Sequence, residues 1–378
     1  MKGFAIERWY RLIGTGFATL FVLSAFTALH FAYSRTIAPD FLSYWAAGRM
    51  AAEGHAPSAY DLVAHRAVEQ KLFPALGYLP FVYPPPFLLI VLPFGIVPFM
   101  VGFAAWIALT AVLYVAATRR ISDVRFALAQ AAAAANFIIG QNGFLFAAVF
   151  IRGFTLIEKR PFLAGSILGL LVLKPQLALV IPIALLAGRE WRAIAAGVLC
   201  SLVIMAAGFV LFGAASYRGF IAMLPLFSHW LSIGRWRWED IASLFALLRF
   251  FGIPHALALA VHILVAVGAA ALTAYAWARK ADARVPILAA ATLLASPYLF
   301  TYDGLLLTLP LAYLLRRGDR RWFALVWAFS LLPMVCYFRP FPNLLPLAAM
   351  LSLWALHRDK NPAALANGIE HGRRAYQV

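Results

Sequence analysis

The sequence predicts an all-α polytopic membrane protein with about 12 transmembrane helices. The chain of 378 residues is 64% hydrophobic, has a mean hydropathy of +0.83 and contains only 15 acidic residues. Its apolar residues form continuous runs, whereas the strands of a membrane β-barrel would alternate in polarity. Most of its 32 Lys and Arg residues lie in short segments between those runs, as the positive-inside rule predicts for cytoplasmic loops.

The first apolar run, residues 12–33, has about the length that crosses a bilayer. It follows a basic start formed by Lys2, Arg8 and Arg11, and it is too long and lacks the cleavage context of a signal peptide. We therefore expect a retained first helix whose N-terminus lies in the cytoplasm.

The basic segments serve as cytoplasmic markers for the rest of the chain. Counting 86–97 as a full crossing would place Arg119 and Arg120 outside, so this segment is predicted to be re-entrant or to lie in the membrane plane. The further apolar segments are 98–118, 124–139, 143–157, 162–173, 175–188, 192–213, 255–278, 286–297, 303–315, 322–338 and 343–357. The result is one integral-membrane domain, 1–357, followed by a cytoplasmic tail, 358–378.

Two regions are predicted on the outer side. The first, 34–85, is a large loop with helical patterns around 41–52 and 60–73. The second, 214–254, carries Arg235 beside Trp236 and Trp238, and such aromatic residues suit a membrane interface.

Asp40 is the most informative residue, because it is a carboxylate placed where the first helix leaves the lipid. Ionisable groups at a membrane boundary cost free energy, which makes them candidates for function. The structural alternative is that Asp40 caps the helix predicted to start at Phe41. A position near solvent would leave Asp40 ionised at neutral pH without a raised pKa.

Three polar breaks interrupt the apolar segments, at 140–143, 174–176 and 296–303, and all fall on the same side as Asp40 by the topology above. Irregular backbone at membrane depth must be buried in protein or line water. Lys174 lies in one break, where a fixed cation could bind a phosphate whose lipid tail stays in the bilayer. Alternatively, it reaches the surface along its own apolar stem.

The other two breaks carry candidate substrate contacts. Gln141 and Asn142 could bind sugar hydroxyls or satisfy the backbone groups of a broken helix. Asp303, beside Tyr302, could orient an acceptor or form an ion pair with Lys174 or Arg235.

Several of these segments resemble glycosyltransferase family 87, in order along residues 12–357. The blocks that carry the resemblance are Asp40-Phe41-Leu42-Ser43-Tyr44-Trp45 with Tyr60-Asp61, Tyr83-Pro84-Pro85-Pro86-Phe87, Gly140-Gln141-Asn142-Gly143, Leu173-Lys174-Pro175-Gln176-Leu177 with Gly188-Arg189-Glu190-Trp191, and Ser296-Pro297 with Tyr302-Asp303. The family comprises polyprenyl-phosphate-mannose-dependent mannosyltransferases and their relatives, with a GT-C fold. The resemblance implies inverting transfer of a hexose on the outer face of the cytoplasmic membrane.

The Asp that follows the first helix is the catalytic residue in such enzymes, which maps onto Asp40. Within the family blocks we assign Lys174 to the donor phosphate. The other candidate substrate contacts are Tyr44, Gln141, Asn142, Gln176, Tyr302, Asp303 and Arg235. Other GT-C enzymes often carry an acidic pair where this chain has a single Asp, so neither a metal nor another cofactor is expected.

The expected function is therefore a multi-pass hexosyltransferase of the bacterial inner membrane, facing the periplasm, with a polyprenyl-phosphate sugar as donor and a glycolipid or glycan as acceptor. The sequence has no Walker motif and no strand-linked GxGxxG, and its net charge of +17 follows topology rather than nucleic-acid binding. The alternatives are a lipid or sugar transporter or flippase, although no internal repeat is found, and a non-catalytic assembly subunit.

Overall fold

The computed structural model describes residues 39–74, 79–333 and 341–358. The predicted first helix, 12–33, and nearly all of the predicted tail lie outside these residues, as does the end of the 322–338 segment. The described residues are helical throughout, apart from their connections and one isolated antiparallel bridge between Ile241 and Phe300. The all-α prediction is confirmed for this part of the chain.

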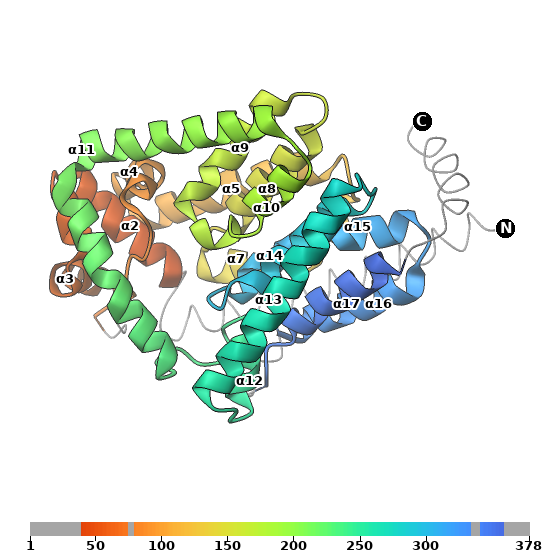
Figure 1. Cartoon of the computed structure of the whole chain (residues 1–378). Coiled ribbons are helices and arrows are strands. Elements are labelled where there is room, and N and C mark those ends of the chain that lie inside the picture. Colours follow the sequence, from red (N-terminus) through yellow and green to blue (C-terminus); the bar gives the residue numbers. More distant parts are fainter. Residues whose placement is uncertain (1–38, 75–78, 334–340, 359–378) are drawn as a thin grey trace.

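Most of the α-helices match predicted segments in position (Figure 1). They are α2 (Pro39–Ala52), α3 (Leu62–Leu72), α4 (Leu88–Gly95), α5 (Phe99–Thr118), α6 (Val124–Leu128), α7 (Ala131–Ile139), α8 (Gly143–Leu156), α9 (Pro161–Gly169), α10 (Ile181–Ala187), α11 (Trp191–Ser232), α12 (Leu244–Phe250), α13 (His255–Ala278), α14 (Arg284–Ala295), α15 (Thr308–Arg316), α16 (Arg320–Leu331) and α17 (Leu345–His357). Short 3-10 turns precede or follow several of them: η1 (Ala56–Tyr60), η2 (Pro85–Phe87), η3 (Leu170–Leu173), η4 (Pro175–Leu177) and η5 (Thr301–Leu307).

Three of these helices, α5, α11 and α13, are long and apolar enough to cross a membrane. Their outward faces expose large aliphatic side chains, such as Leu202 and Val210 on α11 and Leu264 on α13. Apolar surface of this extent is what a lipid-facing helix requires. The structure therefore supports a membrane protein, while the total of about 12 crossings stays a prediction.

Helix α11 bends sharply at Gly213, whose φ of 73° and ψ of 164° are not helical. Figure 1 shows the consequence, because one limb of α11 runs across the top of the molecule and the other descends along its side. The bend falls at the predicted boundary between the 192–213 segment and the second outer region. Only glycine adopts this backbone conformation without strain, so the residue type locates the turn.

The described part of the predicted first outer loop contains α-helices at both predicted patterns, and both helices begin with a recognisable signal. Helix α2 begins at Pro39, whose fixed φ suits the first turn of a helix. Helix α3 is capped by Asp61, whose side chain accepts hydrogen bonds from the N–H groups of Val63 and Ala64 at 2.9 and 2.8 Å. Asp61 thus satisfies two backbone donors in the first turn of α3.

The helices pack against one another in two groups. Helix α11 packs along α9, and α2 packs against α4. Helix α14 contacts α13, α15 and α17, and these helices form the other side of the molecule in Figure 1. Helix α4 has only eight residues, too short to cross about 30 Å of hydrocarbon, and the re-entrant or in-plane placement of 86–97 stays a prediction.

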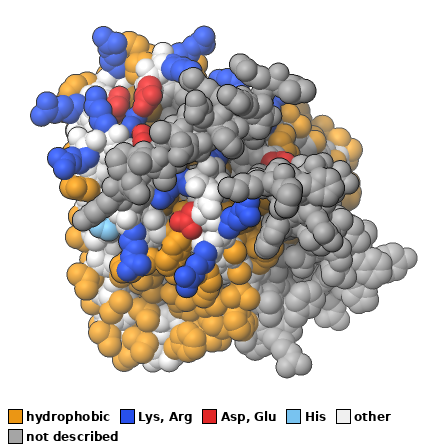
Figure 2. Space-filling view, turned by 90° about the vertical axis from the view of Figure 1, so that its right-hand side faces the viewer, with side chains coloured by type: hydrophobic (Ala, Val, Ile, Leu, Met, Phe, Trp, Pro, Cys, Tyr) orange, Lys and Arg blue, Asp and Glu red, His pale blue; other side chains and the backbone are white. Residues whose placement is uncertain are grey.

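On the face that Figure 2 draws, Lys and Arg side chains lie over the upper and middle parts, and hydrophobic side chains cover the lower part. Arg284, at the start of α14, forms an ion pair with Glu158, just after α8, and so joins two of the loops predicted to be cytoplasmic. This arrangement agrees with basic loops sharing one side of a membrane.

Replacing Gly140 by Ala should destabilise the fold through the junction of α7 and α8. Gly140 ends α7 at a φ of 76°, and an added Cβ would lie 2.4 Å from the Cβ of Phe41 in α2. Left-handed strain and overlap together should cost about 2–4 kcal/mol. The measurement is the midpoint of thermal unfolding of the purified protein in detergent.

Gly318→Ala is the matched control. Gly318 has a φ of 75°, but an added Cβ would meet nothing within 4 Å. It should cost only the left-handed strain, about 1–2 kcal/mol. Equal losses for the two variants would show that the contact with Phe41 does not constrain the fold.

Candidate functional site

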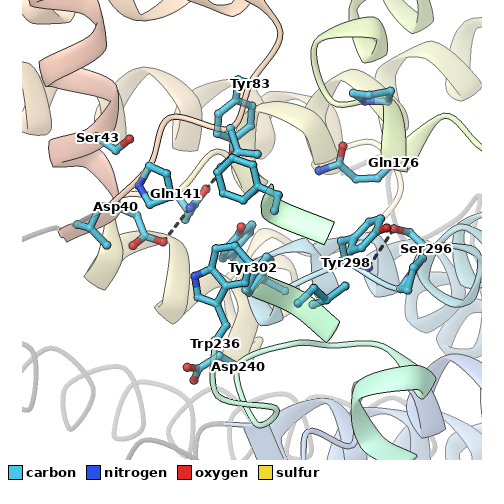
Figure 3. Close-up of a pocket in the computed structure, with 18 of the residues that line it drawn as sticks. Asp40, Ser43, Tyr83, Gln141, Gln176, Trp236, Asp240, Ser296, Tyr298 and Tyr302 are labelled. Carbon is cyan, nitrogen blue, oxygen red and sulfur yellow. Dashed lines mark hydrogen bonds between the residues drawn. The ribbon is translucent and has the colours of Figure 1, made fainter. Parts of the chain in front are cut away.

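A cavity of about 1070 Å³ lies where the three polar breaks meet the start of α2 (Figure 3). The sequence predicted that these breaks would share one side with Asp40, and the structure brings them into one site. The polar and aromatic residues that line the cavity include Asp40, Ser43, Tyr44, Tyr83, Gln141, Gln176, Trp236, Glu239, Asp240, Ser296, Tyr298 and Tyr302.

Asp40 occupies the first turn of α2, after Pro39, so it does not take the cap position that the structural alternative gave it. Its carboxylate is half-buried and its Oδ2 accepts a hydrogen bond of 2.7 Å from the Nε2 of Gln141. Gln141 follows Gly140 in the break between α7 and α8, and the left-handed Gly140 turns the chain there. The helix break thus delivers an amide donor to the carboxylate.

From Gln141 a chain of buried hydrogen bonds leads away from the cavity. The hydroxyl of Tyr44 donates to Gln141 Oε1 at 2.5 Å. The Nδ2 of Asn142 donates to the Tyr44 oxygen at 2.9 Å. Asn142 Oδ1 in turn accepts a bond of 2.8 Å from the Nζ of Lys174.

This series of hydrogen bonds ends in an ion pair whose two side chains are almost fully buried. The Nζ of Lys174 lies 2.5 Å from Oδ1 of Asp303, and both side chains are 1% exposed. Asp303 Oδ2 also accepts from the N–H of Phe300 at 3.3 Å, and the ammonium lies 4.8 Å from the centre of the Tyr302 ring. Every charge at this end therefore has partners, which a buried ion pair needs in order to be tolerated.

The surroundings of Asp40 set its proton affinity. Burial raises the pKa of its carboxyl to about 6, the hydrogen bond from Gln141 opposes that shift, and the nearby Asp240 carboxylate adds to it. The expectation of an unshifted Asp40 near solvent was therefore wrong, because the carboxyl is held inside the cavity wall. At neutral pH the group is still mainly ionised, yet it binds a proton more readily than an ordinary Asp.

The predicted site residues fall into three groups. Tyr44, Gln141, Gln176 and Tyr302 line the cavity with Asp40. Behind the wall lie Lys174, Asn142 and Asp303, all buried, and Lys174 is bonded to both of the others. Arg235 is exposed and lies over the Trp230 ring at 4.5 Å, outside the cavity lining.

Several cavity residues were not among the predicted sites, among them Ser43, Tyr83, Trp236 and Asp240. Tyr83 had a signal, since it starts the proline-rich block of the family resemblance, and its hydroxyl lies 2.8 Å from that of Tyr44. Trp236 and Asp240 belong to the second outer region, which loops back against the Ser296–Asp303 break. The bridge between Ile241 and Phe300 fixes that approach, and it joins segments far apart in the sequence.

One side of the cavity is apolar and reaches the outer surface. Leu179, Ile221 and Leu224 line the cavity while remaining 52%, 60% and 44% exposed. Leu179 comes from the predicted apolar segment 175–188, and Ile221 and Leu224 come from the descending limb of α11, which begins the predicted second outer region. The cavity therefore joins a carboxylate-lined interior to an apolar outer face.

The comparisons with known proteins decide the family. A model of glycosyltransferase family 87 matches residues 81–297, which is more than half of the chain. The chain belongs to glycosyltransferase family 87. Membership makes this helical protein a membrane glycosyltransferase, as the resemblance implied. The matched range contains Gln141, Lys174 and Asp240 but not Asp40 or Asp303, and no curated protein or solved structure matches the chain.

Replacing Lys174 by Met should destabilise the protein strongly, because Asp303 would remain as a buried carboxylate without its cation. Removing one partner of a buried ion pair costs about 3–5 kcal/mol. The measurement is thermal unfolding in detergent at neutral pH.

The double variant Lys174→Met with Asp303→Asn is the control for that loss. It removes both charges and leaves an amide that can still accept from Phe300, so most of the stability should return. A double variant as unstable as the single one would show that packing, and not charge, holds these elements together.

Proposed function

We propose that this member of glycosyltransferase family 87 transfers a hexose, mannose by the family resemblance, from a polyprenyl-phosphate donor to a glycolipid or glycan. The donor and acceptor meet in the cavity beside Asp40, on the periplasmic face of the bacterial inner membrane. Transfer inverts the anomeric centre by single displacement, without a metal or another cofactor.

The observation that carries the proposal is the composition of the cavity. Its interior presents Asp40, Gln141 and aromatic rings, the groups that bind sugar hydroxyls and sugar faces in proteins. Another part of its wall, with Leu179, Ile221 and Leu224, is apolar and exposed at the surface of the molecule. A lipid-linked sugar has these two parts in one molecule.

Asp40 supplies the base. Its carboxylate accepts the proton of the acceptor hydroxyl as that oxygen attacks the anomeric carbon. The bond to the phosphate breaks on the opposite side, and polyprenyl phosphate leaves. Since phosphate leaves readily, no general acid is required.

The contact between Lys174 and the donor phosphate stays a prediction. In the structure the ammonium lies behind the cavity wall, bound to Asp303 and Asn142. A direct contact would require the Lys174 side chain to leave Asp303 and Asn142. Alternatively, the donor phosphate would have to displace the lining residues that separate the cavity from the ammonium. The predicted contact of Arg235 would likewise require it to leave the Trp230 ring.

Asp40→Asn should reduce transfer about 10²- to 10⁴-fold, because the amide cannot accept the proton. In the wild type, kcat/KM should fall as the pH drops through about 6, since a base is active only above its pKa, and burial places that pKa at about 6. The assay is transfer of labelled mannose from polyprenyl-phosphate mannose in membranes that express the protein, measured from pH 5 to 8.

Asp61→Asn is the matched control, because Asp61 lies in the same outer loop but caps α3 outside the cavity lining. It should retain transfer with an unchanged pH profile. Full transfer by the Asp40→Asn variant would show that Asp40 is not the catalytic base. A folded wild type that binds the donor but moves no sugar to any acceptor would favour the transporter alternative.

Leu224→Trp should raise the KM for a long-chain donor about tenfold, since filling a packed apolar site costs roughly 1–3 kcal/mol. A donor with a short, soluble lipid chain should be affected little. Val210→Trp controls for bulk on α11, because Val210 is 79% exposed and does not line the cavity. Equal effects on both donors would place the lipid tail elsewhere.

A further inference from the structure

The hydrogen-bond chain between Lys174 and Asp40 runs in one direction. Lys174 donates to Asn142, Asn142 to Tyr44, Tyr44 to Gln141, and Gln141 to Asp40. A cation stands at the donor end and a carboxylate at the acceptor end. We propose that Lys174 is a positioning residue that acts on Asp40 through this chain.

The two ends fix the direction, because an ammonium can only donate and an ionised carboxylate can only accept. Lys174 makes Asn142 present its oxygen, so the Nδ2 of Asn142 turns to Tyr44. The single hydroxyl proton of Tyr44 is then left for Gln141 Oε1, which also accepts from the backbone N–H of Asn142 at 3.2 Å. Gln141 consequently points the Nε2 of its side-chain amide toward Asp40.

The opposite orientation of Gln141 would place its oxygen against the carboxylate and turn an attraction into a repulsion. Hydrogen bonds in series also polarise one another, so the charge of Lys174 strengthens the last bond. Tyr302 and Tyr83 lie near Asp40 on other elements, and the Asp240 carboxylate opposes its ionisation. The hydrogen bonds that begin at Lys174 favour the ionised form of Asp40 and so offset the effect of Asp240.

The inference rests on the proposed base role of Asp40, and its central test is a pair of tyrosine variants. Tyr44→Phe removes one link and leaves the Lys174–Asp303 ion pair untouched. Weaker donation to Asp40 raises its pKa, so the acid limb of the kcat/KM profile should move upward by roughly half a unit.

Tyr83→Phe is the matched control. The Tyr83 hydroxyl contacts the Tyr44 hydroxyl at 2.8 Å and lies 3.4 Å from Gln141 Oε1, so it is a branch and not a link. Its removal should leave the acid limb where it is, whatever its effect on rate. Equal shifts for the two variants would overturn the proposal.

The double variant Lys174→Met with Asp303→Asn tests the origin of the chain. It should move the acid limb in the same direction as Tyr44→Phe, and adding Tyr44→Phe to it should produce no further shift. Additive shifts would mean that Lys174 and Tyr44 act separately. A raised donor KM with an unmoved limb would instead support a direct phosphate contact by Lys174.

A measurement without substrates keeps the inference separate from the proposed function. The infrared carboxyl band that is lost in Asp40→Asn can be titrated in purified wild type and in both tyrosine variants. An upward shift in Tyr44→Phe alone supports the chain even if no transfer is detected. Identical titrations in wild type and Tyr44→Phe would overturn the inference while leaving the transferase proposal intact.

Discussion

The ion pair between Lys174 and Asp303 is the interaction on which the site depends. Both side chains are almost fully enclosed, so their desolvation must be offset by close contact and by further hydrogen bonds. Asn142 and the N–H of Phe300 provide those bonds, and each comes from a different break in the helical run. Satisfying one buried charge thus forces the three breaks together, and the cavity forms beside them.

The breaks themselves follow from the cost of irregular backbone in an apolar setting. Gly140 turns the chain after α7 because its φ of 76° suits glycine, and Pro175 cannot donate a helical hydrogen bond. The carbonyls and side chains freed in this way must be bonded inside the protein or open to water. The cavity serves both needs, since one part of each break is buried in the network and the other part lines the space.

The sequence predicted those features of the site that depend on local chemistry. Asp40, Gln141 and Lys174 stood out because polar groups beside apolar runs need a reason, and the family resemblance linked their blocks. The ion pair of Lys174 with Asp303 was one of the alternatives that the sequence offered, and the structure confirms it; the choice between the alternatives was not predictable, because it depends on a contact 129 residues away in the sequence. Asp240 was missed for the same reason: its place beside Asp40 depends on the approach of Ile241 to Phe300, which no local pattern encodes.

The charge balance of the cavity explains why a raised pKa on the base is useful. Among the described residues that line it, Asp40, Glu239 and Asp240 are acidic, and none is Lys or Arg. In the reaction proposed above, the departing polyprenyl phosphate would gain negative charge that this wall cannot neutralise. Asp40 would lose its negative charge in the same step by taking the proton of the acceptor hydroxyl. Negative charge is therefore moved from carboxylate to phosphate and not added, and a carboxyl that binds its proton readily favours that exchange.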